Sequence, residues 1–86
     1  MLKIYGSMLC KDCVACVEDL KRENVSFEFL DFADSLLHLK DFLALRDRLP
    51  IFDDAKKNGY IGIPCVLDED GTVALDWSKY VTQARA

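Results

Sequence analysis

The chain has 86 residues, of which 51% are hydrophobic and 30% are charged, as is ordinary for one small globular domain. Its net charge of −4 comes from interleaved acidic and basic residues, and the lack of a basic face argues against nucleic acid as a partner. No stretch approaches the roughly 18 apolar residues of a membrane span. The first residues lack the basic and apolar parts of a targeting segment. We therefore expect a cytoplasmic protein that binds neither nucleic acid nor membrane, and we expect it to be a monomer.

Hydrophobic periodicity and turn residues divide the chain into strands and helices. In chain order we expect a strand at 2–5, a helix at 11–23, a strand at 25–32, a helix at 35–48, a short helix at 50–58, strands at 63–67 and 72–75, and a last helix from residue 77. This β-α-β-α-α-β-β-α order opens with a βαβ unit and closes with a hairpin. It predicts a single α/β domain, residues 1–86, with a small mixed sheet covered by helices on both faces.

The predicted helices have recognisable faces and ends. The helix at 11–23 has apolar residues at the i, i+3, i+4, i+7 spacing of a core face, namely Cys13, Cys16, Val17 and Leu20. Leucines together with Phe42 predict a broad apolar face for the helix at 35–48, which Asp34 or Ser35 can cap. Asp76 can cap the last helix, and Gly59 suits the end of the short helix.

Three of the four cysteines lie within seven residues, and two of them, Cys10 and Cys13, stand where the first strand turns into a helix. Cysteines this close would cross-link almost nothing, so redox or metal chemistry is favoured over structural disulfides. At a helix start, free backbone N–H groups and the helix dipole stabilise a thiolate, which is the form that attacks disulfides. We therefore predict Cys10 as the nucleophile and Cys13, one turn further on, as the second thiol of a redox pair.

The remaining cysteines leave an alternative open. Cys16 falls on the predicted core face and is expected to be a buried packing residue. Cys65 is expected to be buried as well, or else to act as an accessory redox thiol near the site. Together the four thiols are numerous enough for zinc or an iron–sulfur cluster, so a metal-binding or cluster carrier protein is the second hypothesis. Thiols at i, i+3 and i+6 fan around a helix, however, and converge only if the helix unwinds.

With a strand, a Cys-x-x-Cys helix and a later Ile-Pro strand in this order, nearly the whole chain resembles the glutaredoxin family of the thioredoxin fold. Tyr5 to Cys10 has the family's spacing, and Ile63-Pro64 stands where glutaredoxins carry Thr-Val-Pro, whose proline is cis and faces the active site. The resemblance implies a thioredoxin-like four-stranded sheet and a thiol–disulfide oxidoreductase. The chain departs from the family in its Lys11-Asp12 pair, where Pro-Tyr is usual, and in lacking the glycine pair that helps to bind glutathione.

These residues suggest a mechanism. Cys10 attacks a disulfide, and Cys13 then attacks the mixed disulfide and releases the reduced substrate. Lys11 adds positive charge beside the thiolate, whereas Asp12 opposes it. An extended substrate would pair with the backbone at Ile63-Pro64. We expect disulfide-containing protein substrates, no bound cofactor, and either glutathione or a thioredoxin-reductase-type donor as the reductant. Some glutaredoxins also share an iron–sulfur cluster between two chains, which keeps the cluster hypothesis open.

Overall fold

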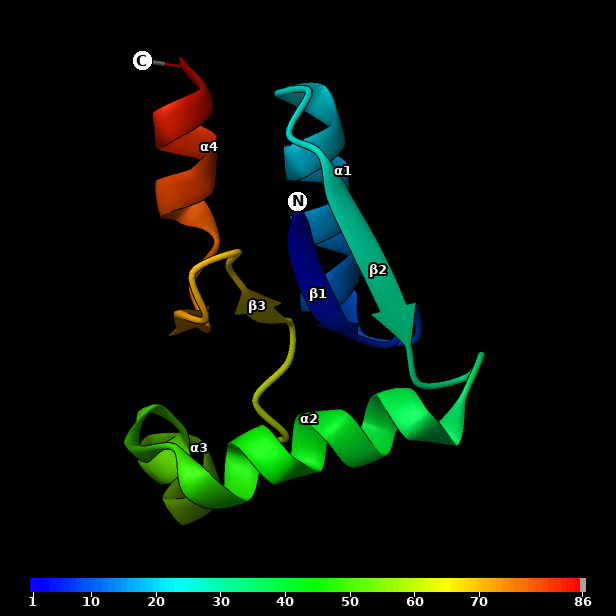
Figure 1. Ribbon diagram of the computed structural model, residues 1–86, viewed down its shortest axis with the longest axis vertical. Helices are drawn as coiled ribbons and strands as arrows, with labels where there is room; N and C mark the ends of the chain where they lie inside the picture. Colours follow the sequence, from blue (N-terminus) through cyan, green and yellow to red (C-terminus); the bar gives the residue numbers. More distant parts are fainter. Residues whose placement is uncertain (86) are drawn as a thin grey trace.

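The elements of the fold follow the predicted order. The computed structural model describes residues 1–85, and along them the elements are β1 (Leu2–Gly6), α1 (Lys11–Arg22), β2 (Phe27–Asp31), α2 (Leu36–Arg48), the 3-10 turn η1 (Pro50–Phe52), α3 (Asp53–Asn58), β3 (Cys65–Leu67), β4 (Val73–Ala74) and α4 (Ser78–Arg85). The prediction of an α/β domain with a mixed sheet is confirmed (Figure 1). The short helix predicted at 50–58 is present as η1 followed directly by α3.

Within residues 1–85 the sheet has four strands in the order β2-β1-β3-β4. β1 pairs with β2 in parallel, and the crossover between them is α1. β1 pairs with β3 in the antiparallel sense, with Tyr5 opposite Cys65, and β3 pairs with β4 in the same sense. Because of this register, the end of β1 lies beside the segment that enters β3. The loop before α1 and the segment before β3 therefore meet at one end of the sheet.

The sheet separates two apolar cores, because successive strand residues point to opposite faces. Ile4 belongs to the core that also contains residues of α1 and α4, among them Cys16 and Leu20. Its neighbour Tyr5 belongs to the other core, which contains Phe42 of α2. The two cores therefore place α1 and α4 on one face of the sheet and α2 on the other. In Figure 1, α1 and α4 are in the upper part of the view, and α2 runs across the lower part.

The predicted helix ends are confirmed by their hydrogen bonds and backbone angles. The Ser35 hydroxyl accepts from the backbone N–H of Leu37 at 3.1 Å, and the Asp76 carboxylate accepts from that of Ser78 at 2.9 Å. Gly59 ends α3 in the left-handed conformation, with φ of 77°. None of the helices in the described part of the chain has the length and apolar character needed to cross a membrane.

Two predictions about these elements need correction. The broad apolar face expected for α2 is only partly buried: Phe42 is inaccessible, whereas Leu36 is 78% and Leu43 is 41% exposed. The small sheet is too narrow to cover every leucine of that helix. The strand expected at 63–67 begins only at Cys65, so Ile63 and Pro64 precede the ladder and are not part of it.

Candidate active site around Cys10

A tight loop carries the chain from β1 into α1 and positions Cys10 at the helix start. In this loop the backbone N–H of Cys10 donates to the carbonyl of Ser7 at 2.9 Å, and the N–H of Leu9 donates to the Ser7 hydroxyl at 3.2 Å. Cys10 has extended backbone angles, yet its carbonyl accepts the first helical hydrogen bond, from Val14. It is therefore the N-cap residue of a 12-residue helix, as the sequence predicted. The N-cap position is the end of a helix where the N–H groups of the first turn have no partner within the helix, although the Cys10 side chain makes no cap hydrogen bond to them.

The two thiols of the pair differ sharply in exposure. Cys10 is half-buried, whereas the Cys13 side chain is completely inaccessible. Burial raises the pKa of the Cys13 thiol from 9.0 to about 12, although a backbone hydrogen bond from Ser7 acts in the opposite direction. The nearby Cys10 thiol raises it further by hydrogen bonding and charge repulsion. Reagents in solution therefore reach Cys10 first, while Cys13 stays protonated one turn away.

A glycine in β1 makes room for the buried thiol. A Cβ added to Gly6 would lie 2.6 Å from Sγ of Cys13 and 3.5 Å from the ring of Phe29. Real Cβ atoms essentially never approach another heavy atom to 2.6 Å, so this position has space only for hydrogen. Gly6 thus allows the first turn of α1 to lie directly against the end of β1, which buries Cys13.

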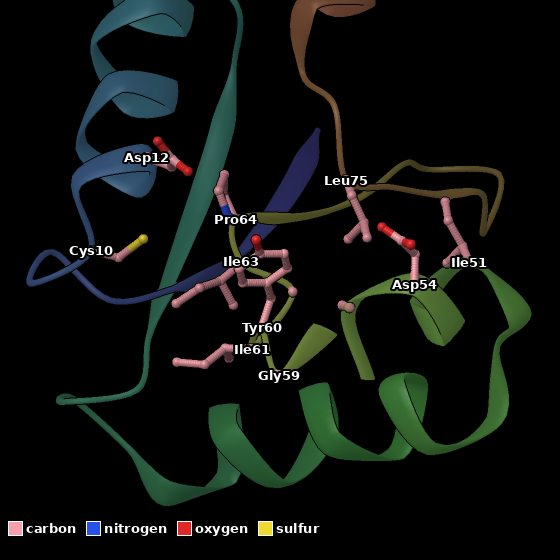
Figure 2. A pocket seen from close by; sticks show the side chains of 12 residues that line it. Cys10, Asp12, Ile51, Asp54, Gly59, Tyr60, Ile61, Ile63, Pro64 and Leu75 are labelled. Carbon is pink, nitrogen blue, oxygen red and sulfur yellow. The ribbon is translucent and has the colours of Figure 1, made fainter. Parts of the chain in front are cut away.

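Cys10 opens onto a groove of about 620 Å³ that separates the start of α1 from α3 (Figure 2). The predicted substrate-binding residues Ile63 and Pro64 line this groove together with Cys10 and Asp12. The Ile63–Pro64 peptide bond is cis, as the resemblance implied. Four of the residues singled out from the sequence are therefore brought together. Lys11 is exposed and does not line the groove.

The far wall of the groove is built from the segment that joins α3 to β3. Tyr60 and Ile61 lie on this wall, and their side chains are 65% and 58% exposed. Arg46 of α2 fixes the segment: its guanidinium donates to the carbonyl of Ile61 and to that of Tyr60, each at 2.8 Å. Gly62 then turns the chain toward Ile63 with φ of 96°, a conformation that favours glycine.

Cys16 and Cys65 lie apart from this site and from each other. Cys16 packs in the core under α1, and Cys65 packs in the core on the opposite face of the sheet. Both side chains are inaccessible, and burial raises the pKa of each thiol from 9.0 to about 12. Among residues 1–85 no three His, Cys, Asp or Glu side chains converge on a point where they could hold a metal ion. The four thiols therefore do not fit the single metal or cluster site of the second hypothesis.

Sequence reasoning did not find the far wall of the groove. Tyr60 and Ile61 of this wall line the groove without having been predicted as site residues, and so do Ile51, Asp54, Ala55 and Leu75 from other elements. A signal existed at Tyr60-Ile61, because two large apolar residues stand there between glycines and outside every predicted element. Asp54 gave no such signal, since a carboxylate in the first turn of a helix is explained by the helix dipole alone.

Comparisons with known proteins identify one relative. No family model matches the chain, and no solved structure matches it significantly. A protein of Haemophilus influenzae, described as uncharacterized, is 43% identical over 76 residues, which make up 88% of this chain and 88% of that protein. The similarity thus covers most of both chains. The chain therefore belongs to the same protein family as this Haemophilus influenzae protein.

Proposed function

We propose that this protein is a thiol–disulfide oxidoreductase of the glutaredoxin type, with a thioredoxin-like fold. The β-α-β-α-α-β-β-α order and the mixed sheet support the fold, because they agree with the resemblance across nearly the whole chain. The single observation that carries the activity is the placement of Cys10. Cys10 stands at the N-cap position of α1, opens onto a groove that Ile63 and Pro64 also line, and has the buried Cys13 thiol one turn behind it.

The proposed reaction transfers two electrons from the dithiol to a substrate disulfide. The Cys10 thiolate attacks one substrate sulfur and forms a mixed disulfide, while the other substrate sulfur leaves as a thiolate and takes up a proton. Cys13 then loses its proton and attacks Sγ of Cys10. The Cys10–Cys13 disulfide forms, and the second substrate sulfur is released as a thiolate. Two thiol equivalents, from glutathione or from the dithiol of a reductase, return the pair to its reduced form.

The burial of Cys13 suits it to the second step. A protonated, inaccessible thiol does not compete with Cys10 for substrates in solution, and its raised pKa keeps it from forming a second thiolate beside the first. In the mixed disulfide the Cys10 sulfur has no proton to lose and cannot repel a Cys13 thiolate, so one cause of the raised pKa of Cys13 is removed. Residues i and i+3 on a helix are neighbours, so the attack requires little movement.

The test is a disulfide reduction assay with the purified protein. The fully reduced protein is mixed with a small uncharged disulfide, and the release of its thiol is followed. We expect Cys10→Ser to abolish the reaction, and Cys13→Ser to stop it at a mixed disulfide that mass spectrometry detects. Cys16→Ala, a matched change on the same helix, is expected to retain activity. Activity that survives Cys10→Ser but is lost in Cys13→Ser would reverse the two roles, and equal activity in all variants would contradict the proposal.

A second assay identifies the electron donor. The protein is supplied with glutathione and glutathione reductase, or with thioredoxin reductase, and the consumption of NADPH is followed with the same disulfide present. The donor that supports turnover is the reductant, and we expect one of the two to do so. Turnover with neither system would contradict an electron-transfer role that depends on these donor classes.

A further inference from the structure

We infer that the groove beside Cys10 takes an apolar protein segment that carries a lysine or arginine near its disulfide, and that it disfavours glutathione. The inference rests on the proposed function, since it names the substrate class of the same site. It follows from the charges and the apolar side chains that surround the thiol.

The charged side chains that line the groove are both acidic. Asp12 stands in the first turn of α1, and Asp54 stands in the first turn of α3 on the opposite wall. In Figure 2 the side chains of Ile63, Pro64 and Leu75 lie between these two carboxylates. No lysine or arginine is among the lining residues of the described chain, and the guanidinium of Arg46 is already bonded to the carbonyls of the far wall.

The floor and walls between the carboxylates are apolar and accessible. Ile51, Tyr60 and Ile61 line the groove. Their exposed fractions of 44%, 65% and 58% are high for large apolar side chains. Leu9, next to Cys10, is 97% exposed. Burying these side chains against an apolar partner is favourable because it removes apolar surface from water. A peptide segment with apolar side chains covers this area, whereas a small polar tripeptide covers little of it.

Glutathione has the wrong charge for this surface. It carries two carboxylates and one ammonium group, so each molecule brings a net negative charge between Asp12 and Asp54. A lysine or arginine beside a substrate disulfide instead meets a carboxylate on either side of the thiol. Electrostatic complementarity of this kind contributes more to the choice between competing partners than to affinity. Each partly exposed ion pair is expected to change the rate constant for reaction with the substrate by a few-fold.

The experiment compares two peptide disulfides that differ in the charge of one flanking residue, and it includes glutathione disulfide as a further substrate. One synthetic peptide has a disulfide flanked by leucine and lysine, a second has glutamate in place of lysine, and glutathione disulfide is the third substrate. Single-turnover rates with the reduced protein are measured for each, together with the small uncharged disulfide. We expect the lysine peptide to react at least about five-fold faster than the glutamate peptide, and glutathione disulfide to be slower still.

Variants assign the preference to the two carboxylates. Asp12→Asn combined with Asp54→Asn is expected to bring the ratio of lysine to glutamate rates to within about two-fold of unity. Asp53→Asn, a neighbouring acidic residue that does not line the groove, is expected to keep the wild-type ratio. Using the ratio removes any uniform effect of Asp12 on the reactivity of Cys10.

The outcomes separate this inference from the proposed function. If the uncharged disulfide is not reduced, the proposed function fails. If the uncharged disulfide is reduced but the glutamate peptide or glutathione disulfide reacts as fast as the lysine peptide, the substrate class is wrong while the oxidoreductase remains. A preference for the lysine peptide that persists unchanged in the double variant also overturns the assignment to Asp12 and Asp54.

Discussion

Trp77 and Asp19 are joined by a hydrogen bond that ties the C-terminal helix to α1: Nε1 of the indole donates to the carboxylate at 2.8 Å, across 58 positions of sequence. The same carboxylate accepts from Arg22 at 3.0 Å. The bond from Trp77 lowers the pKa of Asp19 from 3.8, and the Arg22 guanidinium lowers it further. The carboxylate thus links two helices on one face of the sheet.

Acid is expected to weaken this link. A carboxylate whose pKa is lowered by folding adds stability above its unfolded pKa of 3.8, and this stability is lost as the pH falls through the lower folded value. Urea unfolding should therefore show Asp19→Asn less stable than the wild type near neutral pH and equal to it in strong acid. The exposed change Asp47→Asn serves as the control. An Asp19→Asn deficit that stays constant down to strong acid would contradict the assignment. Unfolding can be followed by the fluorescence of Trp77, which is the single tryptophan of the chain.

Replacing Gly6 by alanine should destabilise the protein by about 1–3 kcal/mol, the usual cost of inserting a carbon into a packed core. The cause is the 2.6 Å approach of the new Cβ to Sγ of Cys13. Urea unfolding of Gly6→Ala measures the loss. In the Cys13→Ala background the sulfur is gone, so the same change should cost clearly less. An equal cost in both backgrounds would show that the contact with Cys13 is not the reason.

High pH should destabilise the protein through its buried thiols. Cys13, Cys16 and Cys65 have pKa values raised from 9.0 to about 12, so the folded state holds these protons more tightly than the unfolded chain. Their contribution is fully present below pH 9 and declines as the pH rises from there toward 12. Unfolding free energies should fall above pH 9, and less steeply in Cys65→Ala, which leaves Cys10 untouched. A pH-independent stability in this range would show that the three thiols are not shielded.

Arg46→Ala should loosen the far wall of the groove. The variant loses both hydrogen bonds to the carbonyls of Tyr60 and Ile61, and because Arg46 is only partly buried the stability cost is about 1 kcal/mol. For a peptide disulfide we expect KM to rise several-fold, with kcat within about two-fold of the wild type, since Cys10 and Cys13 are unaffected. Arg48→Ala on the same helix is the matched control. A fall in kcat at constant KM would mean that Arg46 acts on the chemical step instead.

The sequence was most informative where a local pattern decides the structure. The spacing of Cys13, Cys16 and Leu20 predicted the buried face of α1, and side-chain caps predicted the starts of α2 and α4, because these signals depend on neighbouring residues only. The prediction of Cys10 as the nucleophile depends on the same kind of signal, a thiol at a helix start, and the structure places Cys10 at that position.

What the sequence could not supply depends on distant contacts. The exposure of Leu36 follows from how much of α2 the narrow sheet covers, and the far wall of the groove follows from the Arg46 bonds to Tyr60 and Ile61 across 14 and 15 positions. No sequence pattern at Arg46, Tyr60 or Ile61 predicts that these residues are hydrogen-bonded to one another. The closeness of Gly6 to Cys13 likewise requires the strand and helix to be placed together.

The segments that meet at the groove come from opposite layers of the fold. The thiol pair lies at the start of α1, just after β1, whereas the far wall is the segment between α3 and β3, which Arg46 of α2 holds. In the proposed oxidoreductase, the reactive thiols and the residues that select the substrate therefore lie on separate stretches of the chain. Under the proposed function, substitutions at residues 51–61 would change which substrates bind, while the dithiol chemistry of residues 6–13 stays the same.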